Sequence, residues 1–181
     1  MNLPNKLTML RVFMVPIFIF VLMGDFLAEP MNRYVALLIF VLACITDALD
    51  GHIARSQNLI TNFGKFMDPV ADKLLVSAAL ICMVQMQEIS AWVVILIISR
   101  EFIVTAFRLV ASLDSIVIAA SNTAKFKTIF QMMMVICMLP GFQNPTYLLM
   151  CNMLIWLSVI FTIVSAVEYI MKNKAVFKDS M

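Results

Sequence analysis

Long apolar segments alternate with short polar connections along the whole chain. Six of these segments approach the roughly 20 residues that a helix needs to cross a bilayer. They run from about Thr8 to Met23, Tyr34 to Asp50, Pro69 to Met86, Ala91 to Val110, Thr128 to Leu139 and Tyr147 to Ile170, and the fifth must begin near Asn122 to cross. The connections are too short for a separate soluble domain. The pattern therefore predicts six transmembrane helices in one domain that covers residues 1–181.

The composition agrees with this pattern. Of the 181 residues, 63% are hydrophobic and 13% are charged, whereas a soluble domain is about half apolar and a quarter charged. The mean hydropathy is +0.99. We therefore expect an all-α polytopic membrane protein. No basic cluster is interleaved with exposed aromatic residues, so we do not expect nucleic-acid binding.

The positive charges are distributed unevenly between the two sides of this predicted bundle. If the connections alternate across the membrane, one side holds 12 of the 13 Lys and Arg residues and the other holds Arg33. The positive-inside rule then assigns both termini and the 47–72 stretch to the cytoplasm. The compact length and the lack of a mitochondrial-type presequence favour a bacterial inner membrane.

Four aspartates lie within one polar stretch of this apolar chain. The stretch reads D-A-L-D-G-H-I-A-R and, after eight residues, G-K-F-M-D-P-V-A-D. Asp47 and Asp50 are spaced i, i+3, and Asp68 and Asp72 are spaced i, i+4, so each pair lies on one face of a helix. A short loop makes the two helices antiparallel neighbours. Both pairs can then point at one spot, where ionisable groups at membrane depth indicate a functional site.

Two divalent cations would balance these four carboxylates. Oxygen ligands suit Mg²⁺ or Mn²⁺, and zinc is not expected because His52 is the one histidine. The structural alternative is a salt-bridge cluster of the acids with Arg55, Lys65 and Lys73. We favour the metal site because all four acids share this arrangement.

Small residues and an arginine accompany the acids. Gly51 costs about 1 kcal/mol in a helix relative to alanine, so a ligand that approaches the backbone closely would explain it. Ala54 is also small and lies on the same face, and Arg55 can bind a phosphate through two hydrogen bonds. Gly64 and Pro69 are expected at the entry to the third helix. Together with two metals, these residues indicate phosphoryl transfer.

The pattern D-x-x-D-G-x-x-A-R, eight residues, G-x-x-x-D-x-x-x-D resembles the signature of the CDP-alcohol phosphatidyltransferase family. Its fixed positions are Asp47, Asp50, Gly51, Ala54, Arg55, Gly64, Asp68 and Asp72. The resemblance implies six transmembrane helices around a polar two-metal cavity that faces the cytoplasm. It also implies a homodimer, and a CDP-linked lipid as the donor.

The resemblance further implies roles for individual residues. All four aspartates would bind the metals, and Asp72 would also be the general base. The CDP-lipid would contact the following residues: Gly51, Ala54, Arg55, Thr61, Gly64, Pro4, Asn5 and Thr8. For the last three, a helix cap at the membrane interface is the structural alternative.

Four cations outside the motif are candidates for binding the second substrate. Arg100 and Arg108 lie two turns apart in the fourth helix, and Lys125 and Lys127 open the fifth. Glu101 can neutralise one of them, so an anionic phosphate ester is the expected acceptor. The alternative is that these side chains reach anionic lipid headgroups.

The segments N-L-P-N-K-L-T-M-L-R, S-R-E-F and K-F-K-T-x-x-Q resemble the branch of the family that uses sn-glycerol 3-phosphate. This implies transfer of a phosphatidyl group from CDP-diacylglycerol to that acceptor. One departure is Ala124, where that branch has glycine. Other acceptors stay open, namely phosphatidylglycerol in a cardiolipin synthase, inositol phosphate or serine. A small divalent-cation transporter is a more remote alternative.

Overall fold

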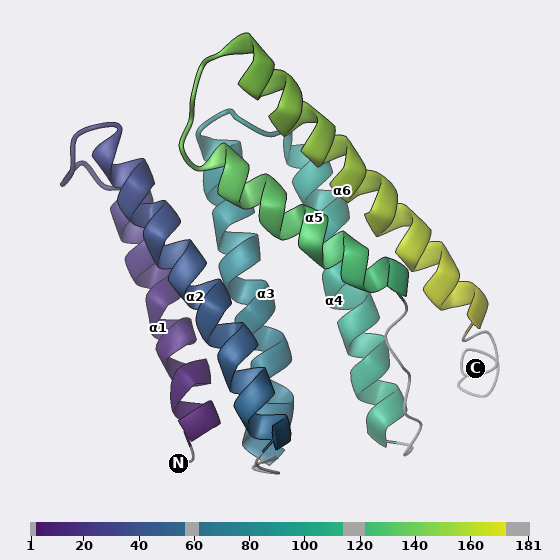
Figure 1. Cartoon of the computed structure of the whole chain (residues 1–181). Helices are drawn as coiled ribbons and strands as arrows, with labels where there is room; N and C mark the ends of the chain where they lie inside the picture. Colours follow the sequence, from purple (N-terminus) through teal and green to yellow (C-terminus); the bar gives the residue numbers. More distant parts are fainter. Residues whose placement is uncertain (1–2, 57–61, 114–121, 173–181) are drawn as a thin grey trace. The chain divides into compact units, whose positions relative to one another are not determined.

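The computed structural model describes residues 3–56, 62–113 and 122–172, and all the regular structure in these ranges is α-helical. Within them, the side chains of residues 3, 4, 50–56, 62–66, 68, 69, 72, 109–113 and 122 lie outside the description. The helices are α1 (Leu3–Met23), α2 (Met31–Ser56), α3 (Asn62–Gln85), α4 (Ala91–Leu113), α5 (Asn122–Met138) and α6 (Pro145–Lys172) (Figure 1). The prediction of an all-α protein is confirmed.

The helices that carry the aspartates extend beyond the apolar segments. α2 continues past Asp50 to Ser56, and α3 begins at Asn62, well before Pro69. An apolar run marks the part of a helix that suits hydrocarbon, whereas most polar residues also tolerate a helical backbone. Gly64 lies in the first turn of α3, at the entry to the helix as expected, whereas the prediction for Pro69 was wrong because it lies farther inside α3.

The helices form two compact units, which are described separately. Unit 1 comprises Met1–Ile89 and Val135–Phe142, and unit 2 comprises Ser90–Met134 and Gln143–Met181. Unit 1 therefore contains α1, α2 and α3, and unit 2 contains α4, most of α5 and α6. α5 crosses the boundary near its C-terminal end.

Unit 1 is built around α1, which packs against both α2 and α3. The contact face of α1 includes Val15, Phe18 and Leu22, all at most 3% exposed. Phe18 packs against Phe40 of α2, with ring centroids 6.1 Å apart. Ala43 of α2 is also fully buried, and such a small side chain lets membrane helices approach closely.

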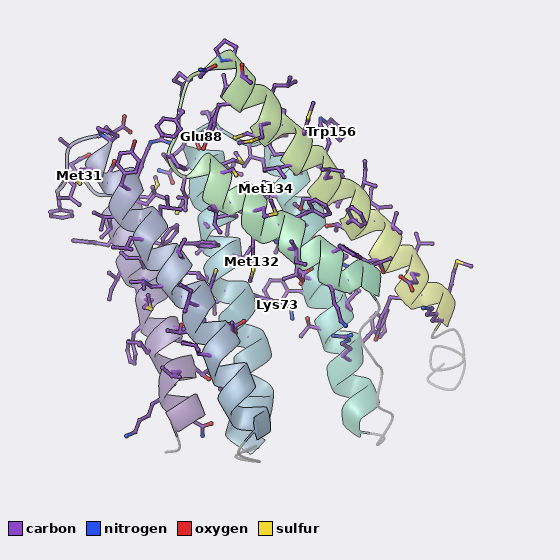
Figure 2. The ribbon with its side chains drawn as sticks, in the orientation of Figure 1. Met31, Lys73, Glu88, Met132, Met134 and Trp156 are labelled. Carbon is purple, nitrogen blue, oxygen red and sulfur yellow. The ribbon has the colours of Figure 1, made fainter. Side chains whose placement is uncertain are left out.

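An ion pair joins the start of α2 to the residues just after α3. Arg33 Nη1 lies 2.5 Å from Glu88 Oε1, and Met31 and Glu88 lie toward the same end of unit 1 (Figure 2). The ring of Tyr34 is 6.5 Å from that of Phe142, so the residues after α5 reach the same end. α2 and α3 therefore run antiparallel, as predicted.

Unit 2 brings α4 and α5 into contact with α6. α4 packs against α6, and Ile97 of α4 is fully buried. Phe126 and Phe130 of α5 lie against Phe161 of α6, with ring centroids 6.1 and 4.9 Å apart. α5 begins at Asn122, which confirms the start predicted from the length that a helix needs to cross a membrane.

α6 also buries hydroxyl groups within its apolar sequence. Thr162 Oγ1 donates a hydrogen bond to the Ser158 carbonyl oxygen at 2.6 Å, and Ser165 Oγ donates one to the Thr162 carbonyl oxygen at 3.0 Å. These bonds to the helix's own backbone satisfy polar groups where water is absent.

Large apolar side chains cover the outer surface of the helices. Trp92 is 81% exposed and Trp156 is 64% exposed, and Trp156 projects outward from α6 (Figure 2). Such surfaces suit lipid rather than water. Among the described residues, Asn5–Met23, Met31–Leu49 and Pro145–Lys172 are long and apolar enough to cross a membrane. The chain is an integral membrane protein, and the count of six spans stays a prediction.

Candidate active site

α1 carries polar side chains on the face that it buries. Asn5, Thr8 and Arg11 are 7%, 0% and 1% exposed, and their spacing places them on one face of the helix, in line with Val15. Each of the three interacts with another residue of the protein. Because α1 begins at Leu3, Asn5 and Thr8 lie inside the helix rather than at its cap.

Arg11 connects this face to the first aspartate of the motif. Its Nη1 atom lies 2.7 Å from Asp47 Oδ1, and the side chains are 1% and 35% exposed, respectively. By charge distribution alone, Arg11 is one of the 12 cations on the predicted cytoplasmic side. The i, i+3, i+6 spacing of Asn5, Thr8 and Arg11 was the available signal that Arg11 faces the site.

The other three aspartates lie where the spacing argument requires. Asp50 is in α2, and Asp68 and Asp72 are in α3, so the i, i+3 and i, i+4 spacings are helical spacings of about one turn. Their side chains lie outside the described residues. The same holds for the side chains of Pro4, Gly51, Ala54, Arg55 and Gly64, and for Thr61 as a whole.

The two pairs of aspartates lie at the same end of unit 1. Arg33 and Glu88 join the N-terminal end of α2 to the C-terminal end of α3, and α1 packs against both helices. The ends that carry the motif, the C-terminal end of α2 and the N-terminal end of α3, are therefore the opposite ends (Figure 1). Whether all four carboxylates meet at one point stays a prediction.

The donor atoms of this motif fit a hard divalent cation. Carboxylate oxygens are ligands that Mg²⁺ and Mn²⁺ prefer. Asp47 keeps 35% of its side chain exposed beside Arg11. Among the side chains that the structure describes, no group of three metal-ligating residues occurs. Asp47 is the one motif aspartate whose side chain belongs to that set.

A second polar group lies between α4 and α5 in unit 2. Glu101 Oε1 accepts a hydrogen bond from Lys127 Nζ and lies 3.3 Å from Arg100 Nη1. Lys127 is 3% exposed and Glu101 is 9% exposed. Lys125 is exposed, because residues two apart in a helix point in nearly opposite directions. The structure brings Arg100 and Lys127 together around Glu101 and leaves Lys125 on another face.

Arg100 also lines a cavity of about 280 Å³ between α4 and α6. The walls are formed by Arg100, Ile103, Val104, Phe107, Ala166, Tyr169 and Ile170. Arg108 is close enough for its charge, like that of Arg100, to act on Tyr169. The Nε atom of Arg108 is buried and has no hydrogen-bond partner among the described residues. Tyr169 thus lies near both arginines, although no sequence motif marks it.

Comparisons with known proteins place this architecture in a family. The family model described as CDP-alcohol phosphatidyltransferase matches residues 1–164. A protein of Bacillus subtilis named CDP-diacylglycerol–glycerol-3-phosphate 3-phosphatidyltransferase is 42% identical over 99% of this chain and 98% of its own length. A protein of Rickettsia bellii with the same name is 36% identical over 97% of each chain. A probable phosphatidylglycerophosphate synthase of Mycobacterium tuberculosis is 37% identical over 93% of this chain and 80% of its own length.

The chain belongs to the CDP-alcohol phosphatidyltransferase family, and it is an enzyme of that class. The resemblance that the aspartate motif indicated is confirmed.

Proposed function

We propose that this enzyme transfers the phosphatidyl group of CDP-diacylglycerol to sn-glycerol 3-phosphate, giving phosphatidylglycerophosphate and CMP. The observation that carries the proposal is the 42% identity, over 99% of the chain, to a protein named for this reaction. The relatives from Rickettsia and Mycobacterium have names of the same meaning. The complete aspartate motif is consistent with the shared chemistry.

The donor would bind at the motif end of unit 1. Asp47, Asp50, Asp68 and Asp72 would hold two divalent cations, Mg²⁺ or Mn²⁺, in line with their oxygen donors. When bound, such cations neutralise the pyrophosphate and stabilise the negative charge that develops on CMP.

The CDP moiety would contact two sets of residues. Around the acids these are Gly51, Ala54, Arg55, Thr61 and Gly64. On α1 they are Pro4, Asn5 and Thr8. The burial of Asn5 and Thr8 on the face that also carries Arg11 supports the second set, because neither residue serves as a helix cap.

In this proposal, Asp72 accepts the proton of the acceptor hydroxyl group. The hydroxyl oxygen attacks the phosphorus that carries the diacylglycerol, and a new phosphorus–oxygen bond forms. The bond from that phosphorus to the CMP oxygen breaks, and CMP leaves with the electron pair. The proton resides on Asp72 until it passes to solvent.

The acceptor phosphate would bind to the cations of unit 2. Arg100, Arg108 and Lys127 are opposed by Glu101, so these four residues carry an excess of positive charge. Arg100 and Lys127 are largely buried, and buried charge is costly unless it is compensated. A phosphate ester would supply the missing negative charge through charge-assisted hydrogen bonds. Exposed Lys125 is better placed to meet anionic lipid headgroups than to bind this phosphate.

We also propose that the active site and both termini face the cytoplasm of a bacterial inner membrane. The distribution of Lys and Arg supports this orientation. The family resemblance supports a homodimer.

An acceptor screen tests the proposed function. The purified protein is incubated in lipid nanodiscs with CDP-diacylglycerol, Mg²⁺ or Mn²⁺, and one acceptor at a time. CMP release and lipid mass are measured with glycerol 3-phosphate, phosphatidylglycerol, inositol phosphate and serine. The proposal expects phosphatidylglycerophosphate from glycerol 3-phosphate and no reaction after the divalent cations are chelated. A lipid product formed only with another acceptor would show that glycerol 3-phosphate is not the second substrate. No CMP release from a folded sample would contradict the proposed class of reaction.

A further inference from the structure

Arg11 is the most completely buried charged side chain among the described residues, with 1% of its surface exposed. Its neighbours on the buried face of α1, Thr8 and Val15, are at most 3% exposed. Its guanidinium group lies 2.7 Å from Asp47 Oδ1 on α2. A charge at such a place is expensive unless a carboxylate compensates it. Arg11 and Asp47 therefore form a defined pair between the two helices.

We infer that Arg11 is a positioning residue, which holds the Asp47 carboxylate in the orientation that a divalent cation requires. The inference rests on the proposed function, because it takes Asp47 as a metal ligand. Arg11 itself touches neither the cation nor the substrates in this account. It acts through its ion pair with Asp47.

The geometry of the pair supports this role. The contact is an ion pair, since Arg11 Nη1 makes no hydrogen bond of good geometry with the described residues. The strong attraction at 2.7 Å nevertheless holds the Asp47 carboxylate toward α1. Arg11 is itself held by the packing of α1 against α2 and α3. Asp47 keeps 35% of its side chain exposed, so Arg11 does not enclose it completely. Residues that orient a ligand in this way commonly change metal affinity by about 10- to 100-fold when they are replaced.

Arg11 has a second effect on the same site through its charge. Four carboxylates on two neighbouring helices repel one another when no cation is bound. A buried guanidinium beside Asp47 lowers this repulsion. Lysine at position 11 would keep the charge but not the planar arrangement of donors, so the two effects can be separated.

Arg33 provides a matched control within the same unit. It is also a partly buried arginine, 13% exposed at its side chain, and it is paired with a carboxylate, Glu88. That pair lies at the end of unit 1 opposite the aspartate motif. If an arginine pair contributes only to folding, Arg11→Met and Arg33→Met should affect metal binding equally.

Manganese binding to the full-length protein in nanodiscs tests the inference. The electron paramagnetic resonance signal of free Mn²⁺ is measured during titration of wild type, Arg11→Met, Arg11→Lys and Arg33→Met, without substrates. Thermal unfolding of each variant is followed in parallel to identify folded samples. The cation concentration for half-maximal CMP release is then measured for the same proteins.

We expect Arg11→Met to weaken Mn²⁺ binding by about 10- to 100-fold and Arg11→Lys to weaken it less, with Arg33→Met unchanged. The half-maximal cation concentration should rise in the same order. Wild-type Mn²⁺ affinity in folded Arg11→Met would overturn the inference. If Arg11→Met does not fold, wild-type affinity in Arg11→Lys would overturn it. A wild-type protein that binds Mn²⁺ but releases no CMP would contradict the proposed reaction and leave the role of Arg11 standing.

Discussion

Glu101 on α4 accepts a hydrogen bond from Lys127 on α5, and the same carboxylate oxygen lies 3.3 Å from Arg100. One carboxylate therefore holds two cations that come from different helices. Lys127 is 26 residues from Glu101 in sequence. Their contact fixes the register between α4 and α5 at the place where we expect the acceptor phosphate.

Replacing Glu101 with glutamine should weaken acceptor binding. The amide keeps the size of the side chain but loses the charge that holds Arg100 and Lys127. Charge-assisted hydrogen bonds contribute about 1.5–3 kcal/mol each, so the KM for glycerol 3-phosphate should rise by about 10-fold or more. The KM for CDP-diacylglycerol should change little. Steady-state kinetics with each substrate varied in turn measures both values.

Glu168→Gln is the control for this experiment. Glu168 also pairs with a lysine, Lys172, at 2.5 Å, but that lysine is 66% exposed. Its loss should leave the acceptor KM near the wild-type value. An acceptor KM that Glu101→Gln leaves unchanged would show that the Glu101 pairs only stabilise the fold.

The two lysines at the start of α5 should differ in their importance. Lys127 is 3% exposed and paired, whereas Lys125 is exposed. We expect Lys127→Met to raise the KM for glycerol 3-phosphate by about 10-fold or more, because one charge-assisted hydrogen bond to the phosphate is lost. Lys125→Met should change it by less than about 2-fold, as for most exposed cations. Equal effects of the two substitutions on the acceptor KM would contradict the proposed acceptor site.

Asp72→Asn should separate the chemical step from donor binding. The asparagine amide cannot take up the proton from the hydroxyl group of glycerol 3-phosphate. CMP release in a single turnover should therefore fall to background. Binding of CDP-diacylglycerol, measured by equilibrium binding in nanodiscs, should be largely retained because three aspartates remain. Loss of donor binding together with turnover would mean that Asp72 acts mainly as a metal ligand.

Gly141 should not tolerate a side chain. Its φ is +66°, and a Cβ atom there would clash with the guanidinium group of Arg33. The left-handed backbone alone costs an L-residue about 1–2 kcal/mol, and the contact with Arg33 adds to it. Gly141→Ala should lower the melting temperature measured by thermal unfolding, while Gln143→Ala, at an exposed position of the same connection, should not. Equal melting temperatures for these two variants would contradict this account.

The sequence predicted the centres of the helices better than their ends. Apolar segments located all six helices, because burial in lipid requires continuous hydrophobicity over a full crossing. They did not locate residues 51–56 of α2 or the start of α3 at Asn62. There the backbone stays helical in polar sequence, and hydropathy contains no signal for that.

The candidate site shows the same division between local and long-range information. The spacing of Asp47 and Asp50 is local information. In a helix it places both residues on one face, so the sequence alone predicts this feature of α2. The Arg11–Asp47 and Glu101–Lys127 pairs join different helices, and they depend on which faces meet. A cation in an apolar helix indicates that it needs a partner, but it does not identify that partner. For this reason the sequence predicts only that Arg11 lies on the cytoplasmic side, and it does not predict the pair with Asp47.

On the buried face of α1, polar side chains end at Arg11 and apolar ones begin at Val15. These residues are four apart, which is about 6 Å along a helix axis. The change from polar to apolar side chains in the interior of unit 1 is therefore confined to about one helical turn. Because this apolar face is packed against α2 and α3, it leaves no room for the acyl chains of a donor whose pyrophosphate lies beside Asp47. The acyl chains would then have to lie along the exposed apolar surface of the helices, where side chains such as Phe13 and Ile17 face outward.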